Sequence, residues 1–121
     1  MKVIKVPEDV VVSVPQVNGK VVRYVDETHS IFKFLQECID VFEQFSKGHV
    51  NALLYVKLTK ILSETDRAKG EVWFEDGDFK KLQDAVGAVA WISPKMNASY
   101  IPFYEAVSSA RTEAMSPDKK V

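Results

Sequence analysis

Two valine-rich segments near the N-terminus constrain the fold of this chain more than any other feature. Residues 10–14 and 21–25 each contain at least three valines, and the segment 15–20 between them contains Asn18-Gly19. An Asn-Gly pair between two β-branched runs predicts a hairpin, with its turn over residues 15–20. Residues 2–6 are also β-prone, so we expect an N-terminal hairpin or three-stranded meander. Because so few strands cannot stay folded alone, helices must cover one face of this sheet.

The remainder of the chain is expected to be mainly helical. Apolar residues recur at helical spacing in four segments, and a short β-branched and aromatic strand at residues 71–74 separates the second from the third. We expect Thr28 or Ser30 to cap the first helix, and Asp76 or Asp78 to cap the third. The expected helices cover approximately residues 31–47, 50–68, 79–92 and 102–114.

The first expected helix has a wide apolar face. Its apolar side chains span about 180° of arc, whereas a surface helix needs only about 100°. This face must bury against two elements, or against its own domain and a second molecule. In the second helix, Tyr55 lies at the margin of the apolar stripe and Val56 falls outside it. The residues expected inside are Val50, Leu53, Leu54, Leu58, Ile61 and Leu62.

These elements predict an α+β fold. We expect a small antiparallel sheet, made of the N-terminal hairpin or meander plus one later short strand, packed on one face by about four helices. A chain of 121 residues is long enough to bury a core as one domain. We therefore expect a single α+β domain over residues 1–114 and a flexible C-terminal tail over residues 115–121.

Charge and composition favour no class of charged partner. The formal net charge is -1, from 16 basic and 17 acidic residues, so attraction to nucleic acid or to an anionic membrane should be weak. No apolar run approaches the length of a membrane span, and residues 1–9 lack the features of a secretory signal. Cys38 is the single cysteine, which excludes an intrachain disulfide. We expect a cytosolic protein with no nucleic-acid and no membrane partner.

The residues with chemical potential do not form a recognisable catalytic or metal motif. The acidic run 75–78 departs from the calcium-loop pattern, and helix capping explains it more simply. His29 and His49 flank expected helix starts without ligand-spaced neighbours, so we expect polar surface or capping roles. Cys38 lies on the apolar arc and should be a buried, inert thiol. We predict no catalytic residue, cofactor, metal or small-molecule substrate; an enzyme would instead show a deep pocket where a histidine meets carboxylates.

The order of elements resembles that of small proteins of tailed bacteriophages, described as virion accessory or tail-assembly proteins. The resemblance covers most of the chain as a pattern of apolar and acidic positions. The segments that carry it are the hairpin ending in Val25, the helix start at 31–35, the helix with Leu54, Ile61 and Leu62, the segment 70–82, and the closing helix with residues 102–107.

This resemblance implies a protein that binds other protein subunits, either itself or virion components, through surface complementarity. It implies a place in the host cytoplasm or in a virion. The residues at or beyond the margins of the inward arcs, Phe34, Val41, Tyr55 and Val56, are the expected contacts. The alternative function is a small regulatory or inhibitory protein that binds a host enzyme, which would need no chemistry of its own.

Overall fold

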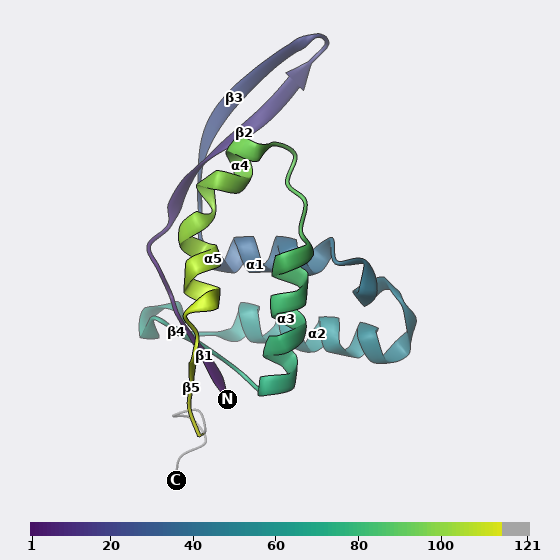
Figure 1. The fold of residues 1–121 in the computed structure, drawn as a ribbon, viewed down its shortest axis with the longest axis vertical. Helices are drawn as coiled ribbons and strands as arrows, with labels where there is room; N and C mark the ends of the chain where they lie inside the picture. Colours follow the sequence, from purple (N-terminus) through teal and green to yellow (C-terminus); the bar gives the residue numbers. More distant parts are fainter. Residues whose placement is uncertain (115–121) are drawn as a thin grey trace.

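A computed structural model describes residues 1–114 of the chain, and the expected C-terminal tail over residues 115–121 lies outside the described residues. The described part confirms the α+β class, because helices combine with two small antiparallel sheets (Figure 1). The elements follow in the order β1 (Lys2–Lys5), β2 (Val10–Asn18), β3 (Val21–His29), α1 (Ile31–Asp40), η1 (Glu43–Ser46), α2 (Gly48–Glu64), η2 (Arg67–Lys69), β4 (Glu71–Phe74), α3 (Asp76–Ala88), α4 (Pro94–Ser99), α5 (Ile101–Ser108) and β5 (Arg111–Thr112).

The first sheet joins strands that are far apart in the sequence, in the order β4-β1-β5 with antiparallel neighbours. Ile4 of β1 lies opposite Val72 of β4, and both are fully buried. The expected meander of the first three strands does not form, because β1 pairs with β4 and β5 rather than with β2. The later strand at residues 71–74 is confirmed, and the amide of Val6 extends its ladder by donating to the carbonyl of Gly70.

The second sheet is a hairpin of β2 and β3 that is longer than expected. Its turn is only Gly19-Lys20, since Asn18 already pairs with Val21, and Gly19 has φ +65°. Glycine with positive φ at the first position of a two-residue turn is typical of a type II′ hairpin. Pro15 therefore lies within β2 rather than in the turn. Pairs alternate along such a ladder, so the missing donor of Pro15, opposite Tyr24, falls on the outer edge of β2, where it costs no hydrogen bond to β3.

Helix α1 lies in the core and packs against both α2 and α3. Ser30 caps it as expected, with its hydroxyl accepting from the amide of Lys33 at 3.2 Å. The helix ends at Asp40 rather than near residue 47, because the chain turns into η1 and re-enters a helix at Gly48, which has φ +81°. Six side chains of α1 are buried: Ile31, Phe32, Phe34, Leu35, Cys38 and Ile39. The wide apolar arc is thus enclosed mainly by this domain itself.

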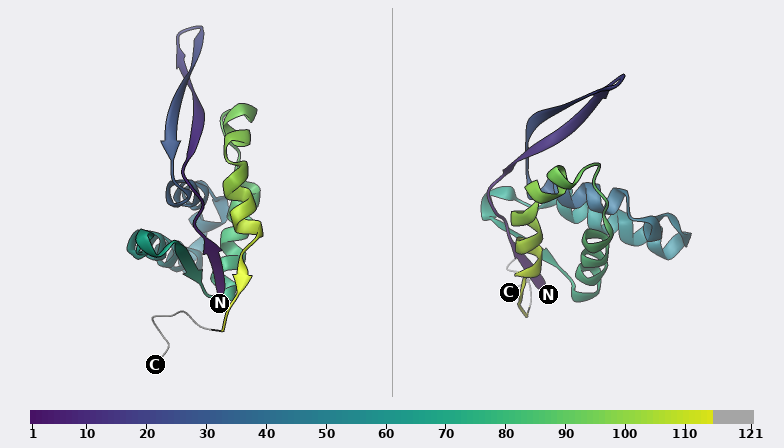
Figure 2. Two further views of the ribbon diagram at one scale, coloured as in Figure 1. Left: turned by 90° about the vertical axis from the view of Figure 1, so that its left-hand side faces the viewer. Right: turned by 45° about the horizontal axis from the view of Figure 1, so that its top comes forward.

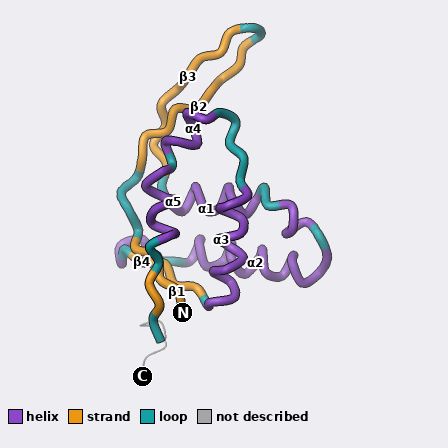
Figure 3. Tube along the Cα trace, viewed as in Figure 1, coloured by secondary structure: helices purple, strands orange, loops and turns teal. Residues whose placement is uncertain are grey.

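Helix α2 is buried less than expected. Leu58 and Leu62 are buried, whereas Val50 and Leu53, which were expected inside, are exposed. The first half of α2 packs on η1 and extends beyond α3 (Figure 3). It therefore has a neighbour on one side only, and its apolar residues on the other side stay in contact with solvent.

The C-terminal helices differ from the expectation at the starts of the first two and at the end of the last, because α5 ends at Ser108 rather than near residue 114 and β5 follows it. Helix α3 begins at Asp76, and neither Asp76 nor Asp78 caps it, because the N-cap position is Glu75. The segment expected to be a loop before the last helix contains α4, which is capped by the hydroxyl of Ser93. The first-turn proline of α5, Pro102, is as expected. Tyr100, between α4 and α5, and Phe103 and Tyr104 of α5 supply rings that pack against Phe34 of α1.

Candidate functional site

The most unusual surface of the described chain is the β2–β3 hairpin, residues 10–29, which we name the arm. The arm projects beyond the helices in two orthogonal views (Figures 1 and 2). A two-stranded hairpin has little stability of its own and normally covers an apolar face with other elements. Here, half of the large apolar side chains that are exposed within residues 1–114 belong to the arm: Val11, Val17, Val21, Val22, Tyr24 and Val25.

Apolar side chains occupy both faces of the arm. Val17 lies opposite Val22 on one face, and Val14 lies opposite Val25 on the other. Val17, next to the turn, is 71% exposed. An antiparallel sheet with one solvated face usually shows polar residues there. The outer half of the arm instead has valine on both faces, which is typical of a surface that another molecule covers.

The two edges of the arm are not equivalent. Helix α4 lies beside β2, where Val12 is fully buried (Figure 1). By contrast, all eight residues of β3 from Val21 to Thr28 are exposed. The ammonium of Lys95 in α4 lies 4.6 Å from the centre of the Tyr24 ring, on this exposed part of β3. The open edge of the arm is therefore that of β3.

A buried hydrogen-bonded chain attaches the base of the arm to the core. His29 Nδ1 lies 2.7 Å from the hydroxyl of Tyr100, and Nε2 lies 2.8 Å from Oε1 of Glu27. A neutral imidazole satisfies both contacts when Nε2–H donates to the carboxylate and the phenol donates to Nδ1. The expectation that His29 is a surface or capping residue is wrong, because it is buried. Its role in this structure is to anchor the last residue of β3.

The phenol and the imidazole of this hydrogen-bonded chain are both buried. Tyr100 is fully buried, and burial raises the pKa of its phenol well above the ordinary value. Both ring nitrogens of His29 are occupied by the contacts above. A histidine does meet a carboxylate here, but its imidazole is buried and only the side chain of Glu27 reaches the surface.

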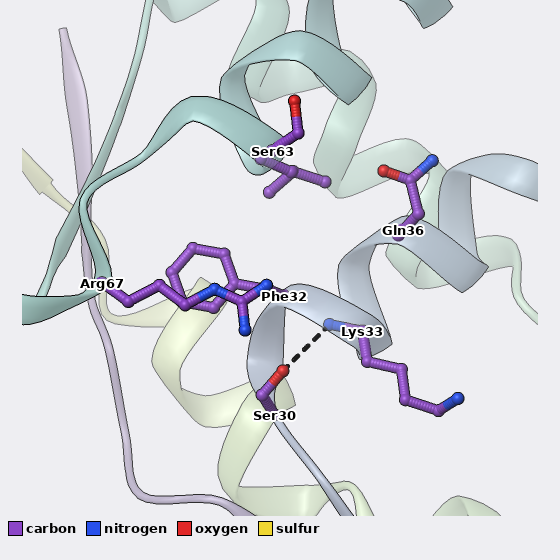
Figure 4. A pocket seen from close by; sticks show the side chains of 7 residues that line it. Ser30, Phe32, Lys33, Gln36, Ser63 and Arg67 are labelled. Carbon is purple, nitrogen blue, oxygen red and sulfur yellow. Dashed lines mark hydrogen bonds between the residues drawn. The ribbon is translucent and has the colours of Figure 1, made fainter.

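A pocket outside the arm lies between α1 and the end of α2 (Figure 4). It has a volume of about 330 Å³. Ser30 Oγ accepts from the amide of Lys33, and Ser63 Oγ donates to a backbone carbonyl, so neither serine is paired with a base. The guanidinium of Arg67 lies over the ring of Phe32 at 4.5 Å. The lining residues are Ser30, Phe32, Lys33, Gln36, Leu62, Ser63 and Arg67.

Cys38 is the buried thiol that the sequence predicts. Its side chain is enclosed in the core, and burial raises the pKa of the thiol to about 12. Within residues 1–114 there is no group of three or more His, Cys, Asp and Glu side chains placed to hold a metal ion. Over the same described range, no helix has the length and apolar character needed to cross a bilayer.

The four residues expected to contact a partner are not all on the surface. Phe34 is a correction: it is 0% exposed, because rings from distant segments, including Trp91 and Tyr100, pack around it. Val41 is 64% exposed and Val56 is 60% exposed. Tyr55 is half-buried, and its hydroxyl donates to Asp40 Oδ1 at 2.5 Å. Asp40 is the residue before Val41 in the sequence.

Sequence reasoning missed the arm as a candidate site. The signal was present, since valines stand at positions 17, 21 and 22 on both sides of the turn. The turn was expected over residues 15–20, and a hairpin with such a turn has strands too short to project from the body. Comparison of the chain with known protein families, with curated protein sequences and with solved structures gave no match.

Proposed function

We propose that the chain is a non-enzymatic protein–protein interaction module and that the arm is its main docking element. The single observation that carries this proposal is the exposure of valine on both faces of a projecting hairpin. Removing apolar surface from water contributes about 25 cal/mol per Å² to an association, against the cost of ordering the two partners. A partner that covers the outer arm would therefore gain affinity and would also stabilise a hairpin that lacks support of its own.

A second, smaller surface supports the same function. Val41, which follows the last residue of α1, and Val56 of α2 are both exposed. Tyr55 adds an aromatic ring next to Val56 in the sequence, with its hydroxyl held by Asp40, which precedes Val41. In this proposal the surface formed by these side chains is an accessory contact, and Phe34 has no part in it.

The nature of the partners is also part of the proposal. The pattern of apolar and acidic positions that resembles small tailed-phage proteins favours other structural subunits of a virion as partners. The near balance of charges over the chain favours partners recognised by shape and apolar contact rather than by a strong field.

A comparative native pull-down tests the docking function. Tagged wild type, the arm variant Val17→Thr/Val22→Thr and the control Val50→Thr are used as baits, and the captured proteins are identified by mass spectrometry. Threonine keeps the β-branched shape and removes apolar surface. We expect wild type and the control to capture the same proteins and the arm variant to lose them. Equal capture by all three baits would contradict the proposal.

A further inference from the structure

The outer edge of β3 presents a continuous row of backbone hydrogen-bonding groups. Because Asn18 and Val21 close the two-residue turn as a hydrogen-bonded pair, every second residue of β3 from Val21 onward directs its amide and carbonyl toward β2. The alternate residues direct theirs away from β2. Within residues 1–114, no backbone hydrogen bond joins those outward groups to another element. They belong to Val22, Tyr24, Asp26 and Thr28.

The outer edge of β2 cannot present such a row. Pro15 interrupts it, since proline has no amide hydrogen and its position directs the missing donor outward. Helix α4 also lies beside β2. A strand that adds to the arm can therefore pair only with β3. Addition of a strand to an exposed sheet edge is a common mode of protein recognition.

We infer that the strand added to β3 is β3 of a second copy of this chain, antiparallel and related by a two-fold axis at Val25. The result is a four-stranded sheet in the order β2-β3-β3-β2. This inference rests on the proposed function of the arm as a docking element, and it names the partner of that site. A two-fold contact of this kind uses the same surface on both copies and closes as a dimer.

The charges along β3 select this register. With the axis at Val25, Arg23 of each copy lies opposite Glu27 of the other, so two opposite-charge pairs flank a valine pair. Opposite charges at directly facing positions stabilise a sheet. Arg23 forms no ion pair with any other residue in the described part of the chain. Glu27 uses Oε1 to accept from His29, which leaves Oε2 for the arginine.

Neighbouring registers that keep the outward groups facing one another are less favourable. An axis at Tyr24 places Arg23 opposite Val25 and Val21 opposite Glu27, so both charged residues face valine and neither opposite-charge pair forms. An axis at Asp26 places two aspartates opposite each other, and an axis at Arg23 does the same with two arginines. Like charges directly opposite destabilise a sheet. The register centred on Val25 is the one among these four that pairs both charges and keeps valine against valine.

The same register covers the exposed tip of the arm. Val21 comes to lie opposite His29 of the second copy, and Val22 opposite Thr28, where the second arm enters its own core. The valines next to the turn therefore gain neighbours from the second copy's base. The formal net charge of -1 per chain places little repulsion between two copies.

Charge reversal tests the inference directly. Arg23→Glu and Glu27→Arg each turn the two attractive pairs into repulsive ones, so each variant alone should dissociate. An equimolar mixture restores both attractive pairs, since the arginines of one chain face the glutamates of the other. Lys60→Glu, at an exposed site on α2, makes the same change of charge away from the arm and serves as the control. Mass is measured by sedimentation velocity from low to high micromolar concentration, and circular dichroism checks that each variant is folded.

We expect wild type and Lys60→Glu to approach twice the mass of one chain. Each arm variant alone should have a dissociation constant raised at least about tenfold, and the mixture should recover a one-to-one dimer. A monomeric wild type at every concentration would overturn the inference, and so would a dimer indifferent to Arg23→Glu. If wild type is monomeric and the arm variant still loses the proteins that wild type captures in the pull-down, the docking function stands and the second-copy partner is wrong.

Discussion

Lys57 of α2 forms an ion pair with Asp78 in the first turn of α3, with Nζ 2.8 Å from Oδ2. The side chain of Asp78 is only 12% exposed, whereas that of Lys57 is 47% exposed. The same ammonium donates to Glu75 at 3.1 Å. The pair therefore fixes two helices against each other, and it explains why Asp78 is buried although it does not cap α3.

Replacing Lys57 by methionine should destabilise the protein by about 1–2 kcal/mol, because it leaves the carboxylate of Asp78 buried without its cation. The stem of methionine preserves the packing of the lysine stem. Adding Asp78→Asn to Lys57→Met should cost less than the sum of the two single changes. Urea unfolding of the four proteins measures this coupling. Strict additivity would show that the two side chains do not interact.

The ion pair also predicts a dependence on alkaline pH. Hydrogen bonds to Asp78 and Glu75 raise the pKa of Lys57 above its ordinary value of 10.5. A group whose pKa is raised by folding contributes stability that is fully present below the unfolded pKa and is lost as pH rises through the folded pKa. The difference in unfolding free energy between wild type and Lys57→Met should thus be constant near neutral pH and should shrink above pH 10.5. A difference that grows with alkaline pH would contradict this assignment.

The anchor at the base of the arm predicts a specific effect of one hydroxyl. Tyr100→Phe removes the donor to His29 Nδ1 and leaves a buried ring nitrogen without a partner, at a cost of about 1–3 kcal/mol. Tyr24→Phe removes the same group from an exposed ring and should change stability by less than about 0.5 kcal/mol. Chemical unfolding compares the two variants. Equal effects would mean that the His29–Tyr100 contact does not hold the arm.

The burial of Phe34 predicts a clear separation between core and surface. Phe34→Ala should cost about 3–5 kcal/mol, as expected for a large-to-small change in a packed core. Val41→Ala removes a side chain that is 64% exposed and should stay within about 0.5 kcal/mol. Thermal unfolding measures both. If Phe34→Ala lost little stability but weakened the capture of partners, Phe34 would belong to the interface and not to the core.

The elements that the sequence predicted well depend on local chemistry. The Ser30 cap and the strand at residues 71–74 are read from neighbouring residue types, and the structure has both. The end of α1 at Asp40 was not predictable in this way, because residues 41–45 continue the apolar spacing of a helix. The strand that pairs with β1 was not predictable from local patterns either, since the sheet brings residues 2–5 beside residues 71–74, which are far away in the sequence.

The candidate site was predictable only in part. The exposure of Val41 and Val56 agrees with their positions at or beyond the margins of the apolar arcs, and their contact with a partner stays a prediction. Phe34 was misplaced because periodicity gives the direction of a side chain but not the number of elements around it. The rings of Trp91 and Tyr100, which enclose Phe34, lie more than fifty residues along the chain. The length of the arm was not predictable, because a proline near Asn18-Gly19 favours a turn, whereas Pro15 lies within β2.

Two glycines predict opposite effects of the same substitution. Gly19→Ala places a Cβ at φ +65° in the turn of the arm, where space is free but the backbone is strained, so we expect a loss of about 1 kcal/mol. Gly87→Ala in α3 also meets no atom within 4 Å and has no positive φ, so it should gain up to about 1 kcal/mol from helix propensity. Amide hydrogen exchange should show faster exchange in the outer arm of Gly19→Ala, with the amide of Ile4 in β1 unchanged. Losses of equal size in both variants would contradict the conformation assigned to the turn, and with it the register on which the pairing of β3 depends.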